Sequence, residues 1–318
     1  MKLRKSIWNA FFAQGGRTLV VMTRGRVEGW RLTEGERAVP GAIHLWSVNL
    51  RHPNHLLEVP GAGRVIATNT RGQHLCVDTE TGSVVWQAQS SSEGDRGVVL
   101  RDGRYLVATW KGILHLFDVV SGQEVGRKDI GCMLRTPHVA ADNPHPTVTT
   151  FPRYDPARSE PPERGLCRLD PDTGTLASLW SDARCTGVYV SPDGTRMLAR
   201  FLDPEPATRG KAVDQRWAVR AVAGGRLIAE RRFSFQDVTD AGPGWSPDGQ
   251  IIAFPGITKN VLVDAETLGT IAEIPGDYPQ APVFSPDGTL ICLCRNKTGG
   301  LMPVADLGAF PPAPAPPH

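Results

Sequence analysis

The chain alternates short apolar runs with turns rich in glycine, proline and aspartate. The clearest turn is the tetrapeptide Ser-Pro-Asp-Gly, which occurs at residues 191–194, 246–249 and 285–288. In such a turn proline presets φ, aspartate hydrogen-bonds to nearby amides, and glycine accepts a positive φ. Each copy lies between two short β-prone runs, such as 188–190 and 197–199. The pattern therefore predicts a β-hairpin around each turn.

Looser copies of the same unit precede these three. Their turns fall at residues 14–17, 61–64, 101–104 and 141–144. The final turn residues of the seven units are at positions 16, 63, 103, 143, 194, 249 and 288, so successive units are 39 to 55 residues apart. Regular spacing of this size indicates a repeat architecture rather than a β-sandwich.

A second turn, related to Asp-x-x-Thr-Gly, follows the first in most units. Clear copies are at 78–82, 118–122, 170–174 and 264–269, and weaker ones are at 33–35 and 223–225. Two hairpins per unit give four strands in roughly 40 to 50 residues, which is the period of a propeller blade. The sequence predicts an all-β fold, a single seven-bladed β-propeller of four-stranded antiparallel blades.

The two turn types resemble those of the bacterial WD-repeat-like and YVTN-type seven-bladed propellers, and also those of quinoprotein-type repeats. The resemblance extends from about Trp8 to Val304. No Gly-His dipeptide opens the blades and no Trp-Asp dipeptide ends them, so the usual WD hydrogen-bonded network is not expected. Because these families include scaffolds, enzymes and accessory domains, the resemblance implies the fold and leaves the function open.

The repeat also predicts the domain boundaries. We expect one propeller over residues 1–308, with blades at about 7–50, 51–90, 91–130, 131–182, 183–237, 238–276 and 277–308, followed by a proline-rich disordered tail at 309–318. The last unit has no clear outer strand of its own, and the prolines of the tail cannot donate ladder hydrogen bonds. We therefore expect residues 1–6 to supply that strand and to close the ring.

Two units are longer than the others because of segments between their second and third strands, at 151–165 and 203–215. Both segments should rise from the same rim on adjacent blades. Long loops in compact domains are either functional or tolerated insertions. If these are functional, the candidate partner-binding residues are Arg153, Tyr154, Arg158, Arg164, Arg209 and Lys211.

Composition limits the classes of partner and the cellular location that we expect. The 35 basic and 33 acidic residues give a net charge of +2, which predicts neither a nucleic-acid nor a membrane partner. No apolar run is long enough to span a membrane, and the apolar stretch after the basic N-terminus is too short for a signal peptide. Six cysteines in a chain of this size need not form disulfides, and the Cys292-Leu293-Cys294 pair should be buried. We expect a cytoplasmic, bacterial protein that is a monomer by itself or a subunit of a complex.

No motif for catalysis, a metal or a cofactor is found. His52 and His55 would need further ligands, and the turn aspartates Asp193, Asp248 and Asp287 have a local structural role. Asp237 and Asp240 could line the mouth of the central channel, although solvated loop residues are the simpler interpretation. There is no G-x-S-x-G sequence, phosphate loop or dinucleotide fingerprint.

The function that these observations favour is a non-catalytic scaffold that docks another protein on the rim carrying 151–165 and 203–215. Two alternatives stay open. One is a propeller enzyme, such as a lactonase-like hydrolase or lyase, with a metal in its central channel. The other is a sensor that binds a small ligand at the channel mouth.

Overall fold

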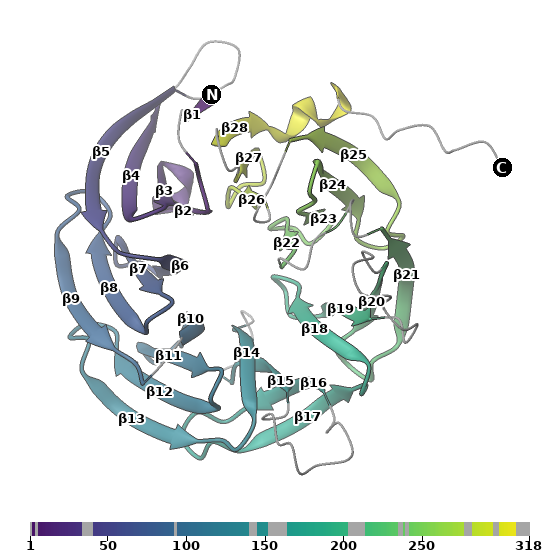
Figure 1. Ribbon diagram of the computed structural model, residues 1–318, viewed down its shortest axis with the longest axis horizontal. Helices are drawn as coiled ribbons and strands as arrows, with labels where there is room; N and C mark the ends of the chain where they lie inside the picture. Colours follow the sequence, from purple (N-terminus) through teal and green to yellow (C-terminus); the bar gives the residue numbers. More distant parts are fainter. Residues whose placement is uncertain are drawn as a thin grey trace, which may run out of the picture.

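The computed structural model of the chain describes residues 2–3, 6–33, 41–91, 94–139, 145–151, 164–202, 214–234, 238, 242–276, 282–294 and 299–309. Its strands form seven four-stranded antiparallel sheets, arranged like blades around a central axis (Figure 1). The predicted all-β fold and the number of blades are therefore confirmed. Helical structure in the described residues consists of two short 3-10 segments, η1 (Gln14–Gly16) and η3 (Val304–Ala309).

In the first four blades the strands follow one another in chain order from the axis outwards. Their bounds are β2 (Asn9–Ala13), β3 (Thr18–Thr23), β4 (Arg26–Thr33), β5 (Gly41–Asn49), β6 (Pro53–Val59), β7 (Arg64–Asn69), β8 (Gln73–Asp78), β9 (Val84–Gln89), β10 (Gly94–Val99), β11 (Arg104–Thr109), β12 (Ile113–Asp118), β13 (Glu124–Asp129), β14 (Met133–His138), β15 (Thr147–Phe151), β16 (Gly165–Leu169) and β17 (Leu176–Ser181).

The fifth and sixth blades repeat this order, and the seventh combines the two ends of the chain. Their strands are β18 (Cys185–Val190), β19 (Arg196–Leu202), β20 (Gln215–Ala221), β21 (Leu227–Phe233), β22 (Gly244–Trp245), β23 (Ile251–Phe254), β24 (Lys259–Asp264), β25 (Thr270–Pro275), β26 (Val283–Phe284), β27 (Leu290–Leu293), β28 (Gly299–Pro303) and β1 (Lys2–Leu3). Strand β1 pairs antiparallel with β28, with Leu3 opposite Gly299. The N-terminal strand is thus the outermost strand of the last sheet.

The Ser-Pro-Asp-Gly turns have the predicted chemistry. In the fifth blade, Gly194 has a φ of +74°, and the amide of Thr195 donates a 3.1 Å hydrogen bond to the Asp193 carboxylate. The Ser191 hydroxyl accepts a 3.0 Å hydrogen bond from the amide of Arg196, where the second strand begins. Asp193 is therefore a turn-forming residue, as the sequence predicts.

The hydrophobic core lies between blades rather than in one central mass. Each of seven apolar clusters draws its buried side chains mainly from two neighbouring sheets. One of them joins Ile7 and Phe12 of the first blade to Cys292 and Cys294 of the last. Because apolar faces pack against the next sheet, each blade depends on both neighbours for its burial.

Tryptophans on outer strands add a polar contact between blades. The indole nitrogen of Trp46, on β5, donates a 2.9 Å hydrogen bond to the carbonyl oxygen of Thr79 in the next blade. Its ring lies against Gly82, where a Cβ atom would come within 2.5 Å of Trp46. The turn glycine is thus required both by its φ of +74° and by the adjacent indole.

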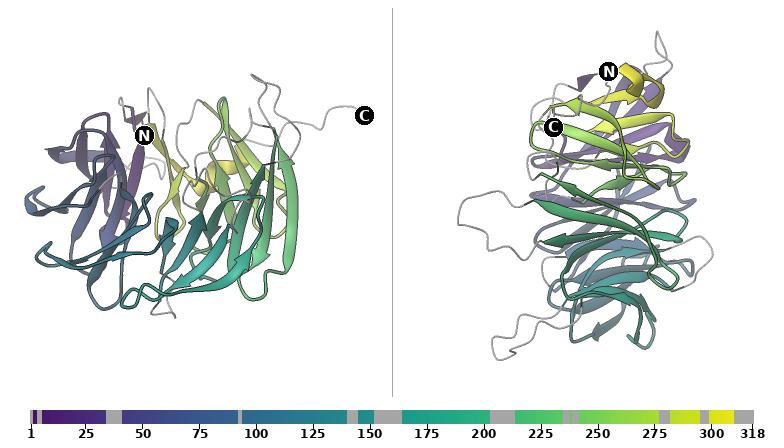
Figure 2. Two further views of the ribbon diagram at one scale, coloured as in Figure 1. Left: turned by 60° about the horizontal axis from the view of Figure 1, so that its bottom comes forward. Right: turned by 90° about the vertical axis from the view of Figure 1, so that its right-hand side faces the viewer.

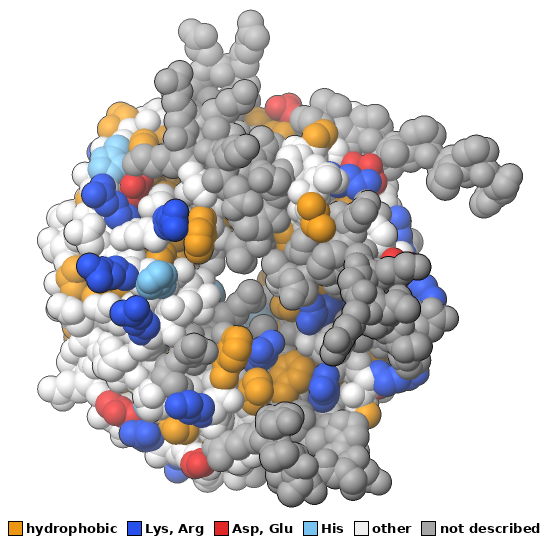
Figure 3. Space-filling view, viewed as in Figure 1, with side chains coloured by type: hydrophobic (Ala, Val, Ile, Leu, Met, Phe, Trp, Pro, Cys, Tyr) orange, Lys and Arg blue, Asp and Glu red, His pale blue; other side chains and the backbone are white. Residues whose placement is uncertain are grey.

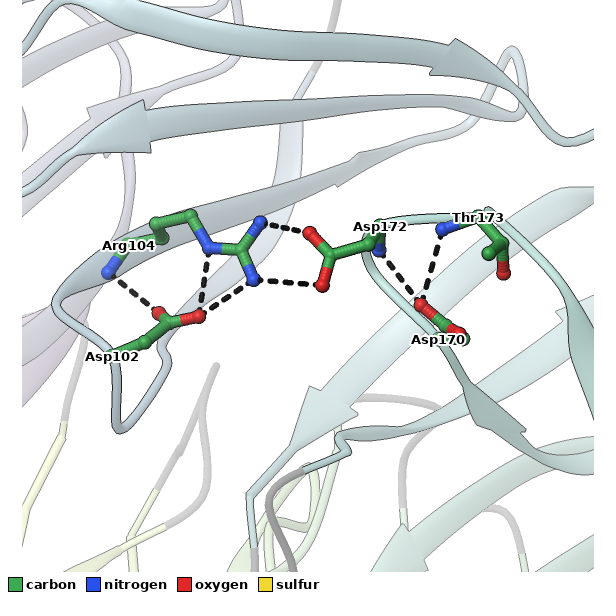
Figure 4. A network of polar contacts seen from close by, with 5 residues as sticks. All are labelled: Asp102, Arg104, Asp170, Asp172 and Thr173. Atoms are coloured by element: carbon green, nitrogen blue, oxygen red, sulfur yellow. Dashed lines mark hydrogen bonds and ion pairs between the residues drawn. The ribbon is translucent and has the colours of Figure 1, made fainter.

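The junction between the third and fourth blades carries an ion pair instead. Gly174, the corresponding turn glycine, faces Ile130 and Lys128 rather than an indole. Beside this turn, the Arg104 guanidinium lies between the Asp102 carboxylate of its own blade and the Asp172 carboxylate of the next (Figure 4). These contacts lower the pKa of Asp102 and raise that of Arg104.

Candidate interaction surface

The alternating direction of the strands divides the turns of the propeller between two rims (Figure 2). Turns from the first to the second strand and from the third to the fourth form one rim, here the aspartate rim. It is named for the recurring turn residues Asp78, Asp118, Asp170, Asp193, Asp248, Asp264 and Asp287. The opposite rim carries the turns between second and third strands and the connections between blades. We call it the basic rim, after Arg24, Arg51, Arg71 and Lys111.

Three of these basic side chains occupy the same position in consecutive blades. Arg24, Arg71 and Lys111 each stand directly before the glycine of the turn between second and third strands, and each is exposed. Arg51, in the connection from β5 to β6, is exposed as well. Within the described part of the chain, none of the four forms an ion pair.

The distribution of charge differs between the centre and the periphery of one face. Figure 3 shows Lys and Arg side chains spread around the central opening, whereas Asp and Glu side chains lie nearer the outer edge. On the aspartate rim the carboxylates are engaged in their own turns. For example, the Asp78 carboxylate accepts a 2.8 Å hydrogen bond from the Thr81 amide, which is the largest of the contacts that lower the Asp78 pKa. The recurring turn carboxylates thus lie on the aspartate rim, although Asp129, at the end of β13, and Asp182, after β17, lie on the basic rim.

A row of alternating aromatic and guanidinium groups runs along the basic rim. It begins at Trp110, in the turn between β11 and β12, whose side chain is 42% exposed. The guanidinium carbon of Arg135 lies 4.5 Å from the centroid of that indole and 5.4 Å from the centroid of the Phe151 ring. Arg164 lies 5.8 Å from the same Phe151 ring. These distances are those of cation–π contacts, so the row links the third and fourth blades.

Arg164 extends the row to the fifth blade. Its Nη1 atom donates a 3.3 Å hydrogen bond to the carbonyl oxygen of Cys185, the first residue of β18. Its own carbonyl oxygen accepts a 2.9 Å hydrogen bond from the amide of Asp182. Arg164 is thus held at the place where the fourth blade meets the fifth, near the end of the long segment 151–165.

Arg164 is the one predicted partner-binding residue that lies within the described part of the chain. The other five, Arg153, Tyr154, Arg158, Arg209 and Lys211, lie outside the described residues, as do Asp237 and Asp240 and residues 310–318 of the tail. The structure brings Arg164 together with Phe151, the first residue of the same long segment.

Arg135 and the three basic turn residues are not among the residues predicted from the sequence. Arg135 gives no local signal because its partners lie on other strands, Trp110 in the third blade and Phe151 on β15 of its own blade. Arg24, Arg71 and Lys111 do carry a signal, a basic residue before the turn glycine at the blade period. Aligning the second-to-third-strand turns with one another reveals it.

Other candidate chemistry is sparse in the described residues. No group of three His, Cys, Asp or Glu side chains there is placed to hold a metal ion. His52 is exposed in its connection, whereas His55 lies within β6. All six cysteines lie in the described ranges, and none forms a disulfide. Cys292 and Cys294 are buried in one cluster, where their mutual contact and burial raise the pKa of Cys294, so these thiols belong to the core.

Comparison with known proteins identifies the family. Residues 40–242 match the family described as outer membrane protein assembly factor BamB, and this segment is more than half of the chain. The chain belongs to this family. The match begins before β5 and ends near the start of the sixth blade, so it includes the whole Trp110–Arg164 row of this BamB-family propeller.

Solved structures of similar fold include the β-propeller domain of Cps50 (Swd1) from Myceliophteria thermophila. The alignment covers 96% of the BamB-family chain and 99% of that domain, with a TM-score of 0.69 and 12% identity. At this identity the likeness concerns the fold. No curated protein matches the sequence. Among the described residues, no helix is both long and apolar enough to cross a membrane.

Proposed function

We propose that this protein is a non-catalytic interaction scaffold that docks another protein on its basic rim, around the segments 151–165 and 203–215. The observation that carries the proposal is the row of Trp110, Arg135, Phe151 and Arg164, which spans the third and fourth blades and contacts the fifth through Arg164. Tryptophan and arginine dominate the residues that contribute most to binding at protein interfaces. An exposed indole stacked on a guanidinium is already ordered, which lowers the entropic cost of docking.

Membership of the BamB family supports the proposal, since the family is described by an assembly role rather than by a reaction. No observation on the described residues favours an enzyme. We accordingly propose a protein without catalytic activity, a monomer by itself or a subunit of a larger assembly. A stoichiometric divalent ion in protein purified without chelator would contradict this and favour a propeller enzyme.

The docking proposal is tested by affinity purification of the tagged protein from its own cells. The wild type is compared with Trp110→Ala and with a variant in which 152–163 and 203–213 are replaced by short Gly-Ser links. Val120→Ala is the matched control, because Val120 is 66% exposed on the aspartate rim. We expect a partner that is retained by the wild type and the control and lost by the two other variants. A partner lost equally by Val120→Ala, or no partner at all, would overturn the proposal.

We also propose a reducing, cytoplasmic location, supported by the six described cysteines, which form no disulfide with one another. The family description raises the opposite possibility of a cell-envelope protein. Fractionation of cells that express the tagged chain distinguishes the two. Recovery in the envelope fraction would contradict the proposed location and leave the docking proposal intact.

A further inference from the structure

We propose that the partner presents an acidic, extended segment to the basic rim, where it crosses the first three blades and ends at Trp110. This inference rests on the proposed docking function and adds the chemistry of the partner. The repeated cations Arg24, Arg71 and Lys111 are the elements that would bind it, with Arg51 between the first two blades.

The first support is the repetition of charge. A cation at one turn is a normal surface residue, but three consecutive blades place one at the same position before the turn glycine. Consecutive blades present these turns side by side along the rim (Figure 1). An extended chain that follows the rim would therefore meet Arg24, Arg71 and Lys111 in succession.

The second support is that these cations have no counterions among the residues that the structure describes. None of the four residues forms an ion pair with any described residue, whereas Arg104 on the aspartate rim contacts two carboxylates. Cations without internal partners repel one another and attract an anionic ligand. The recurring turn aspartates lie on the opposite rim, while the basic rim carries Asp129 and Asp182 in its blade connections. The field therefore favours approach of an anionic ligand at Arg24, Arg71 and Lys111, away from those two carboxylates.

The third support distinguishes a polypeptide from a nucleic acid. Sequence-tolerant binding of single strands needs aromatic faces on which bases stack. On this rim Arg135 covers one face of Trp110, and Phe151 lies within cation–π distance of both Arg135 and Arg164. Since Phe151 is buried, the row offers at most the second face of Trp110, whereas a stacking platform presents several aromatic faces to successive bases. Stacked guanidinium groups instead suit planar carboxylates, to which their edges donate.

The inference is tested by fluorescence anisotropy with a labelled peptide of about ten residues that alternates glutamate and serine. A peptide with glutamine in place of glutamate, a single-stranded oligonucleotide and vesicles containing phosphatidylglycerol are the comparison probes. We expect the glutamate peptide to bind, to weaken with added salt, and to bind at least about tenfold more tightly than the glutamine peptide.

The decisive variant combines Arg24→Glu, Arg71→Glu and Lys111→Glu. Its matched control combines Arg17→Glu, Arg101→Glu and Arg226→Glu, which reverse three exposed cations at aspartate-rim turns. The two variants have the same net charge. We expect at least about a tenfold loss of peptide affinity in the first and little change in the second. Equal thermal stability of the two variants would show that both are folded.

Three outcomes would overturn the inference. These are equal losses in the two variants, tighter binding of the oligonucleotide or vesicles than of the peptide, and no peptide binding by the wild type. If the wild type does not bind the glutamate peptide, but captures a partner that Trp110→Ala no longer captures, the proposal of an acidic segment is contradicted and the docking function stands. If the partner and the peptide are both absent, both proposals fail.

Discussion

The indole nitrogen of Trp86, on β9, donates a 2.9 Å hydrogen bond to the carbonyl oxygen of Val119 in the following blade. The same relationship joins Trp46 to Thr79 one blade earlier. In the fifth blade Arg231 takes the place of the indole, because its Nη1 atom donates a 2.7 Å hydrogen bond to the carbonyl oxygen of Leu268 in the sixth blade. An outer-strand donor bound to the turn of the next blade is thus a recurring means of fixing blade to blade.

This packing predicts that Gly122→Ala is more harmful than its backbone angle alone requires. Gly122 has a φ of +73°, and a Cβ atom there would lie 2.6 Å from Cδ2 of Trp86. We expect a loss of about 3 kcal/mol in the free energy of unfolding, from left-handed backbone strain together with overpacking. Urea denaturation measures the change.

Gly224→Ala supplies the matched control for that experiment. Gly224 has nearly the same φ, +71°, but a Cβ atom at this position would have no described neighbour within 4 Å. It should lose only about 1 kcal/mol, the cost of the backbone angle. Equal losses in the two variants would show that the indole contact contributes nothing.

The ion pair between the third and fourth blades should be weak and salt-dependent. Arg104 and Asp172 are partly exposed, with side-chain exposures of 25% and 67%. We therefore expect a coupling of about 0.5 kcal/mol between Arg104→Ala and Asp172→Ala in a double-mutant cycle. The coupling should shrink as salt is added. A coupling that is absent even at low salt would mean that the contact does not stabilise the junction.

The turns and the blade count were predictable because their signals are local. The four residues of Ser-Pro-Asp-Gly are enough to predict a turn. As predicted, the Asp193 carboxylate accepts a hydrogen bond from a backbone amide, and Gly194 has a positive φ. Repetition at the blade period then converts local hairpins into a fold. The pairing of β1 with β28 was predictable because the last unit lacks an outer strand of its own, which the N-terminal residues can supply.

The interaction surface was only partly predictable because its contacts cross between blades. Arg135 and Trp110 meet through the packing of neighbouring sheets, which no short motif records. Net charge did not indicate where cations cluster, since +2 is a sum over the whole chain. The position of a charged residue within its blade, such as Lys111 before the turn residue Gly112, indicates which rim the charge lies on, whereas the net charge does not.

Removing residues 1–6 should lower thermal stability. The deletion removes β1 and leaves the outer edge of β28 unpaired, which also favours association through that edge. We expect the melting temperature to fall by about 2 to 5 °C, measured by calorimetry at several protein concentrations. Removing residues 311–318 is the control and should leave the melting temperature unchanged. An unchanged melting temperature after the N-terminal deletion would show that this strand does not stabilise the propeller.

Mild acid should destabilise the protein through His74. This imidazole is fully buried between the second and third blades, where its Nδ1 atom lies 3.0 Å from the Tyr105 hydroxyl and its Nε2 atom has no partner among the described residues. Burial, and secondarily the neighbouring His115, lowers the pKa of His74 from 6.5 to about 4. A proton on Nε2 would have no acceptor in the part of the chain that the structure describes.

Because the folded pKa of His74 lies below the unfolded value, the unfolded chain binds the proton more tightly. Stability from this residue is complete above pH 6.5 and is lost as the pH falls toward 4, at a cost of about 2 kcal/mol between pH 7 and pH 5. The half-buried His138, whose pKa is also lowered by burial, acts in the same direction. Urea denaturation at pH 7 and pH 5 measures the change in unfolding free energy. We expect His74→Asn to remove most of the change that is due to His74. His44→Asn, at an exposed site, should leave the change as it is in the wild type. An identical pH dependence in His74→Asn and the wild type would show that His74 is not the titrating group.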